Sequence, residues 1–141
     1  AEAPPGLRLA GLLHDASEYV TSDLITPFKA AIGQAYKALE KRVEAAVFLR
    51  FGLPANPPAQ WMRQIKAADR IAAFMEATQL AGFAEVEARR IFGFRGEVPA
   101  IRLVAQAPEV AREAYLKRFR ALERLIKVRG LGLPDRVRAP A

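Results

Sequence analysis

The chain has 141 residues, of which 52% are hydrophobic and 26% charged, and it carries a formal net charge of +7 and no cysteine. This length suits one compact domain, and the lack of cysteine excludes disulfide scaffolds, thiolate metal sites and cysteine nucleophiles. No apolar run reaches the roughly 18 to 20 residues that a membrane span needs, and residues 1–6 do not resemble a signal peptide. We therefore expect a cytoplasmic protein with no membrane partner.

The net charge attracts anionic ligands, nucleotides and nucleic acids included. Arginine-rich helical faces that are simply solvated explain the same charge. The sequence shows neither the aromatic and basic motif of an RNA-binding sheet nor zinc-finger spacing. We therefore do not expect nucleic acid as a partner.

The first predicted helix follows the breaker Pro4-Pro5-Gly6, because the residues of 7–13 are almost all apolar. We expect this helix to be buried on most sides and to run into the only histidine. Residues 21–27 are β-branched or turn-forming and predict a loop. Thr26-Pro27 then predicts a helix start, since proline is tolerated at the first helical position.

Apolar residues at helical spacing predict a helix over 35–51 that Gly52 closes, followed by a proline-rich connector. A long helix is predicted from near Pro58 to Gly82. Trp61 and Phe74 lie on this helix, where we expect them to be core or pocket wall rather than stacking platforms for bases.

The last third of the chain is predicted to hold a short helix over 83–92 and an amphipathic helix over 108–129 that Gly130 ends. Residues 101–105 fit either a helix start or a short extended piece. The apolar stripe of 108–129 is broad enough to pack against its own domain or against a second subunit in a homodimer. The pattern predicts an all-α fold, with one domain over 1–130 and a loosely attached tail over 131–141.

The histidine lies in GLLHDASEYVTSD, residues 11–23, among three acidic residues. If the helix continues through His14, Glu18 lies four residues on and shares its face. Asp69 sits on or beside the apolar stripe of the long helix, where an unpaired carboxylate would cost several kcal/mol. A divalent cation would offset that cost, and imidazole and carboxylate suit Mn, Fe, Co, Ni, Zn or Mg. Ordinary hydrogen bonds and ion pairs of these groups are the alternative.

The stretch LLHDASEYVTSDLITPFK, residues 12–29, resembles the second motif of the HD superfamily of metal-dependent phosphohydrolases. The resemblance is to the branch with bacterial 5′-deoxynucleotidases, in which HDAxE is followed by a GD or SD step and a TPxK or SPxK helix start. The stretch IKAADRIAAFMEA, residues 65–77, resembles the last motif of that branch. Together the motifs cover about residues 7–80 and imply an HD-domain-like helical bundle.

The resemblance implies that His14, Asp15 and Asp69 bind the metal. Glu76 stands seven residues after Asp69 and so returns to the same helix face, where it fits a group that supports a ligand or pairs with a cation. The family site has one further ligand, a histidine on an upstream helix, and this sequence has no second histidine. We expect the native protein to supply that helix from a segment missing from the sequence, because the acidic residues would be costly to keep together without a cation. A degraded site is the alternative.

The resemblance also implies that Glu18 orients or deprotonates the attacking water. Asp23 matches an acidic residue near the nucleotide, which contacts a sugar hydroxyl or assists the leaving group. Lys29 stands at the family spacing to face a phosphate, although a lysine in a first helical turn is usually just solvated.

The implied activity is metal-dependent release of phosphate from a small phosphorylated substrate, in the first place a (deoxy)nucleoside 5′-monophosphate. One alternative is a non-catalytic helical binding module whose acidic cluster is structural. Another is an HD enzyme that acts on a cyclic nucleotide or a nucleoside triphosphate.

Overall fold

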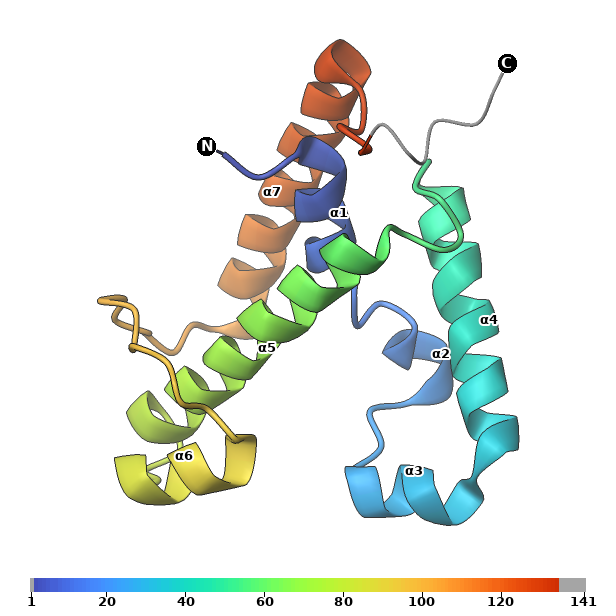
Figure 1. Cartoon of the computed structure of the whole chain (residues 1–141). Coiled ribbons are helices and arrows are strands. Elements are labelled where there is room, and N and C mark those ends of the chain that lie inside the picture. The colour runs from blue at the N-terminus through green and yellow to red at the C-terminus, as the bar shows by residue number, and fades with distance from the viewer. Residues whose placement is uncertain (1, 135–141) are drawn as a thin grey trace. The chain divides into compact units, whose positions relative to one another are not determined.

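A computed structural model describes residues 2–134, apart from the side chain of Thr26 (Figure 1). Within this part of the chain the structure consists of α-helices and turns with no β-strand, so the predicted all-α class is confirmed. The helices are α1 (Pro5–Leu12), α2 (Glu18–Thr21), α3 (Thr26–Ile32), α4 (Gln34–Arg50), α5 (Ala59–Gln79), α6 (Glu85–Phe92) and α7 (Pro108–Arg129). None of the described helices combines the length and the hydropathy that crossing a membrane requires.

The contacts divide the chain into two compact units. Among the described residues, the first unit consists of 2–61 and 119–134, and the second of 62–118. The prediction of one domain over 1–130 stays a prediction. The predicted tail over 131–141 is described only to Pro134, and its remainder lies outside the described residues.

The helix boundaries follow from local chemistry at several points. Proline stands in the first turn of α1 and of α3, where its missing N–H would have no partner inside the helix. Gly33 separates α3 from α4 with φ +80°, a backbone conformation that glycine adopts without steric cost. In α6, Glu85 and Glu87 lie in the first turn and Arg89 and Arg90 in the last, which matches the helix dipole.

In the first unit, α1 packs against Trp61 and the start of the C-terminal tail. The Gly6 N–H donates a 2.9 Å hydrogen bond to the carbonyl of Leu131, so this end of the tail is attached to α1. Phe51 and Phe119 pack edge to face, with ring centroids 5.1 Å apart. These contacts give the first unit a core that joins its sequence-distant segments.

The second unit is built around two aromatic rings in contact. Phe74 of α5 and Phe94, just after α6, have centroids 4.8 Å apart and are both buried. The guanidinium of Arg89 lies 5.3 Å from the Phe74 centroid and 5.5 Å from that of Phe94. Met75, Ala77 and Ala88 complete this buried cluster.

Residues 101–105, for which the sequence left helix and extended structure open, form neither a helix nor a strand. The side-chain amide of Gln79 hydrogen-bonds with the backbone of this segment, as a neighbouring strand would. Its Nε2 donates to the carbonyl of Ile101 at 3.0 Å, and its Oε1 accepts from the N–H of Leu103 at 2.8 Å. Gln79 thus hydrogen-bonds this segment to α5, and Leu103 also packs against the buried cluster.

Candidate active site

His14 lies in the turn between α1 and α2, and both of its ring nitrogens have a close neighbour. Nδ1 lies 2.8 Å from the carbonyl oxygen of Gly11, one turn back in α1. Nε2 lies 3.0 Å from Oδ2 of Asp15. The imidazole is therefore held at Nδ1 by a backbone carbonyl, and its Nε2 lies beside the adjacent carboxylate.

The hydrogen-bond roles follow from the chemistry of the partners. A carbonyl oxygen can only accept, so Nδ1 carries a proton and donates it to Gly11. In the neutral ring Nε2 then presents a lone pair close to the negative carboxylate of Asp15, which repels it. A divalent cation bound by both residues would make this arrangement favourable. This nitrogen and oxygen donor pair fits a first-row divalent metal, and histidines that bind metals usually donate their other N–H to a carbonyl or carboxylate.

The helix does not continue through His14, so the condition under which His14 and Glu18 would share a helix face is not met. α1 ends at Leu12, and a turn over residues 13–17 separates it from α2, which begins at Glu18. The turn closes through hydrogen bonds from the Ala16 N–H to Leu13 and from the Glu18 N–H to Asp15, at 3.0 and 2.9 Å. The turn, rather than a helical repeat, sets the position of Glu18.

Glu18 is nevertheless in an acidic neighbourhood. Its pKa is raised above the usual 4.5, first by partial burial, then by the charges of Asp15 and Asp23 and to a smaller extent Glu40, while Lys29 opposes the shift. A carboxylate with a raised pKa is a stronger base than an ordinary glutamate. The structure thus brings four of the predicted site residues into one electrostatic neighbourhood within the first unit.

Asp23 follows a strained residue. Ser22, which ends α2, has φ 65° and ψ 152° and is the one non-glycine residue with positive φ among those described. This region of backbone conformation is occupied almost only by glycine, so the backbone of Ser22 is strained. The backbone therefore turns sharply immediately before Asp23, whose side chain is exposed.

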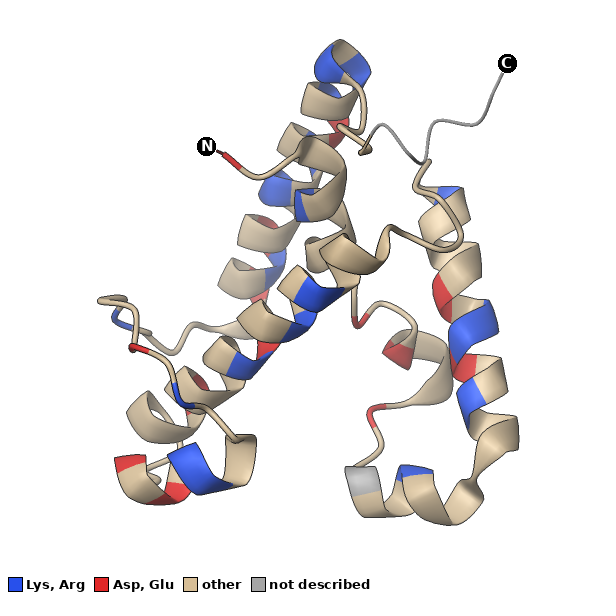
Figure 2. Cartoon of the chain, viewed as in Figure 1, with Lys and Arg blue, Asp and Glu red and all other residues tan. Residues whose placement is uncertain are grey.

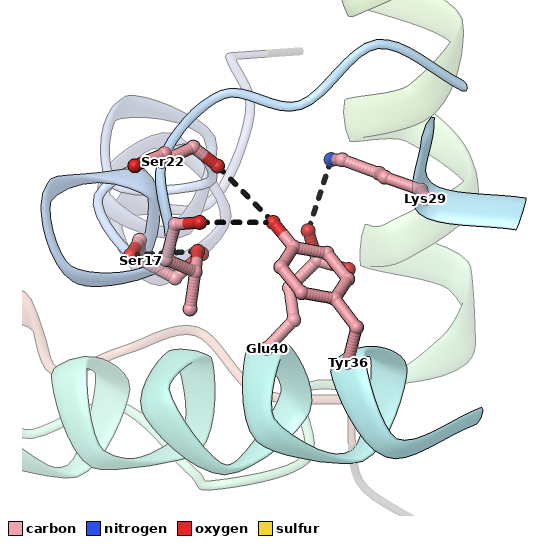
Figure 3. Close-up of polar contacts among 6 residues, drawn as sticks. Ser17, Ser22, Lys29, Tyr36 and Glu40 are labelled. Carbon is pink, nitrogen blue, oxygen red and sulfur yellow. Dashed lines mark hydrogen bonds and ion pairs between the residues drawn. The ribbon is translucent and has the colours of Figure 1, made fainter. Parts of the chain in front are cut away.

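Lys29 is paired rather than solvated. Its Nζ donates a 3.0 Å hydrogen bond to Oε1 of Glu40, and both side chains are partly buried (Figure 3). This hydrogen bond is the largest cause that raises the pKa of Lys29, against the opposing effect of burial. The expectation of an ordinary solvated lysine is therefore wrong, and the ammonium is held in one place on α3.

Two residues of this neighbourhood were not predicted from the sequence. Tyr36 is buried and its hydroxyl lies 3.2 Å from the carbonyl of Thr21 and 3.1 Å from that of Ser22, while Glu40 holds Lys29. They stand four residues apart on α4, a spacing that puts them on one helix face. From the sequence, this spacing predicts only that Tyr36 and Glu40 share a helix face. It does not predict which other segments of the chain they contact.

Asp69 lies on α5 in the second unit and is exposed, so the argument from its burial is wrong. Phe74, whose side chain enters the core of this unit, is five residues further on and therefore about 140° around the helix. The predicted interpretation of Trp61 and Phe74 as core residues is confirmed, since they are 2% and 1% exposed. Glu76 is exposed too, at the edge of a mostly apolar pocket of about 280 Å³.

Within residues 2–134, no three histidine or acidic side chains are grouped so that they could hold a metal ion together. The pair of His14 and Asp15 supplies two donors, and Asp69 remains a predicted ligand from the resemblance. Figure 2 shows that Lys and Arg residues are spread along α4, α5 and α7, with Asp and Glu residues among them.

No family model matches the chain. The chain is similar to an uncharacterized protein of Rhodobacter capsulatus, with 53% identity over 132 residues. The match covers 88% of this chain and 66% of that relative, so the chain spans less than two thirds of the relative's length. The activity, substrates and partners of the whole protein are accordingly proposals.

Proposed function

We propose that the protein is a metal-dependent phosphohydrolase that releases phosphate from a small phosphorylated substrate, a (deoxy)nucleoside 5′-monophosphate in the first place. The arrangement of His14 is the observation that carries the proposal. Its Nδ1–H is engaged by a backbone carbonyl, and its Nε2 lies beside the Asp15 carboxylate. Histidines that bind metals commonly donate their other ring N–H in this way, which supports the proposal, and the resemblance to the HD motif predicts Asp69 as a further ligand.

A bound divalent cation would lower the pKa of a water molecule and neutralise charge on the phosphoryl group. Glu18 would accept the proton of that water, a role that its raised pKa favours. Asp23 would contact the sugar or the leaving group. Lys29 would offer its ammonium to a phosphate oxygen, in exchange for or together with Glu40. Positioning and electrostatics of this kind account for most of the catalysis of phosphoryl transfer.

The test is phosphate release from deoxynucleoside 5′-monophosphates by the purified protein with Mn²⁺ or Co²⁺, before and after a chelator. We expect activity only with metal, loss of metal binding in His14→Ala and Asp15→Asn, and loss of turnover with retained metal binding in Glu18→Gln. Glu97→Gln, in an exposed loop of the second unit, is the matched control. Metal-independent phosphate release, or His14→Ala with unchanged metal binding, would contradict the proposal.

The same assay separates the alternatives. Preference for a cyclic nucleotide or a nucleoside triphosphate would favour the alternative of an HD enzyme that acts on such a substrate. Absence of metal binding by the wild-type protein would favour the binding module, whose acidic cluster would then be structural.

A further inference from the structure

The turn that carries Asp23 needs support from outside its own segment. Ser22 has φ 65° and ψ 152°, a conformation that a residue with a Cβ rarely adopts. Such a conformation persists only where surrounding contacts hold it in place. α2 has four residues, so this short helix alone cannot supply those contacts.

Tyr36 supplies them from α4. Its hydroxyl proton is shared between the carbonyl oxygens of Thr21 and Ser22, the two peptide groups through which the chain turns (Figure 3). The ring is only 8% exposed, so the hydroxyl is fixed by packing and not merely by its hydrogen bonds. The hydroxyl of Thr21 donates in turn to the carbonyl of Ser17 at 3.1 Å, which ties the turn to the start of α2.

Glu40 acts on the neighbouring helix from the same face of α4. It lies four residues after Tyr36 and accepts the hydrogen bond of Lys29 on α3. One helix face thus contacts both segments that carry the residues assigned to the substrate.

We infer that Tyr36 is a positioning residue, which holds the Ser22 turn so that Asp23 faces the substrate, and that Glu40 does the same for the ammonium of Lys29. The inference rests on the proposed function for the roles of Asp23 and Lys29. Tyr36 and Glu40 touch neither substrate nor metal in this scheme. Their effect is to reduce the number of orientations that Asp23 and Lys29 sample before the substrate binds.

The test is Tyr36→Phe in the full chain, which removes the hydroxyl and keeps the ring. Tyr19→Phe, at a residue that is 96% exposed, is the matched control. We expect kcat/KM for the nucleoside monophosphate to fall about tenfold in Tyr36→Phe, mostly through KM, because one hydrogen-bond energy corresponds to about that factor. We expect no change in Tyr19→Phe.

A second arm separates positioning from general stability. In a Ser22→Gly background the turn needs less support, so the loss caused by Tyr36→Phe should shrink to less than about threefold. Equal losses in both backgrounds, or wild-type kinetics in Tyr36→Phe, would overturn the inference. Glu40→Gln should raise KM and spare kcat, and an unchanged KM would overturn the part that concerns Lys29.

Amide hydrogen exchange of residues 22–24 in the metal-free protein tests the contact of Tyr36 with the Ser22 turn, and it does not depend on enzymatic activity. We expect faster exchange in Tyr36→Phe than in the wild type and in Tyr19→Phe. If the wild-type protein releases no phosphate, the proposed function fails, and exchange alone then decides the inference. Unchanged exchange in Tyr36→Phe would overturn it.

Discussion

The ammonium of Lys29 on α3 and the carboxylate of Glu40 on α4 lie 3.0 Å apart, with 27% and 29% of their side-chain surfaces exposed. The pKa of Lys29 is raised above its usual 10.5, chiefly by this hydrogen bond. A raised pKa means that the pair adds stability below pH 10.5, which is lost as the pH rises through the pKa of the folded state. The pair therefore joins α3 to α4 throughout the neutral range.

We expect Glu40→Gln to lower the free energy of unfolding by up to about 1 kcal/mol at neutral pH. Urea denaturation at neutral pH and above the folded pKa of Lys29 measures this, and the difference from wild type should vanish at the higher pH. A double-mutant cycle with Lys29→Gln isolates the pair. A coupling energy of zero at neutral pH would show that the two groups do not stabilise the helix contact.

Ser22→Gly should make the protein more stable. The strained backbone of Ser22 costs about 1–3 kcal/mol, whereas the extra freedom of glycine in the unfolded chain costs about 0.5–1 kcal/mol. Relief of strain is the larger effect, so we expect a net gain of about 1 kcal/mol in chemical denaturation. Ser22→Ala removes the hydroxyl but keeps the Cβ and should gain nothing. Equal stability of the two variants would rule out strain as the cause.

Much of the fold was predictable because local signals mark its helix ends. Pro108 and Gly130 bound α7 as predicted, and the Thr26-Pro27 step begins α3. Each of these signals acts within a few residues, through a fixed proline φ, a missing N–H or a permissive glycine. The sequence itself contains that information, and no distant contact alters it.

The candidate site was less predictable because its geometry depends on contacts between distant residues. The apolar run of α1 continues to Leu13 with no breaker, so nothing local marks the helix end at Leu12. The hydroxyl of Tyr36 lies near carbonyl groups 14 and 15 residues earlier in the chain. Helical periodicity in the sequence does not predict a contact at that separation. Asp69 borders the apolar stripe of α5, and spacing alone does not decide on which side such a residue falls.

Glu18→Gln should stabilise the metal-free protein at neutral pH while it abolishes metal-dependent turnover. The folded pKa of Glu18 is raised above 4.5, so the favourable contribution of this group is present below pH 4.5 and is lost as the pH rises through the folded pKa. At neutral pH the ionised carboxylate is partly desolvated and also faces Asp15 and Asp23, and glutamine removes the charge that both effects penalise.

Thermal unfolding of the metal-free protein at about pH 4 and about pH 7 measures this effect. The gain of Glu18→Gln over wild type should be present at neutral pH and shrink as the solution is acidified. Glu97→Gln should show no such pH dependence. A lower melting temperature for Glu18→Gln at neutral pH would mean that the carboxylate is stabilised by its surroundings, contrary to the direction of its pKa.

Arg89 should be the most sensitive charged residue of the second unit. Its guanidinium lies over the rings of Phe74 and Phe94, pairs with Glu85 and donates a 3.1 Å hydrogen bond to the carbonyl of Gly96. We expect Arg89→Ala to cost about 1–2 kcal/mol, because two cation–π contacts and the packing of the aliphatic stem are lost together.

Arg90→Ala is the matched control, since Arg90 is the exposed neighbour on the same helix. Arg89→Lys should fall between the two, because an ammonium keeps the charge but lacks the planar fork. Urea denaturation followed by circular dichroism gives the three values. A loss in Arg90→Ala as large as in Arg89→Ala would attribute the effect to helix charge instead of ring contact.

Gly6→Ala should destabilise the first unit, although glycine to alanine in a helix usually gains about 0.5–1 kcal/mol. A Cβ on Gly6 would lie 2.5 Å from Cη2 of Trp61 and 2.7 Å from the carbonyl oxygen of Leu131. Both distances are well below van der Waals contact, and the carbonyl belongs to the backbone that accepts the Gly6 hydrogen bond. Overpacking of this kind costs about 1–3 kcal/mol, so we expect a net loss of about 1 kcal/mol or more.

The loss should shrink in a Trp61→Leu background, which opens space beside the new methyl group. A Gly6→Ala variant more stable than wild type in chemical denaturation would show that α1, Trp61 and the start of the tail do not pack as the structure has them.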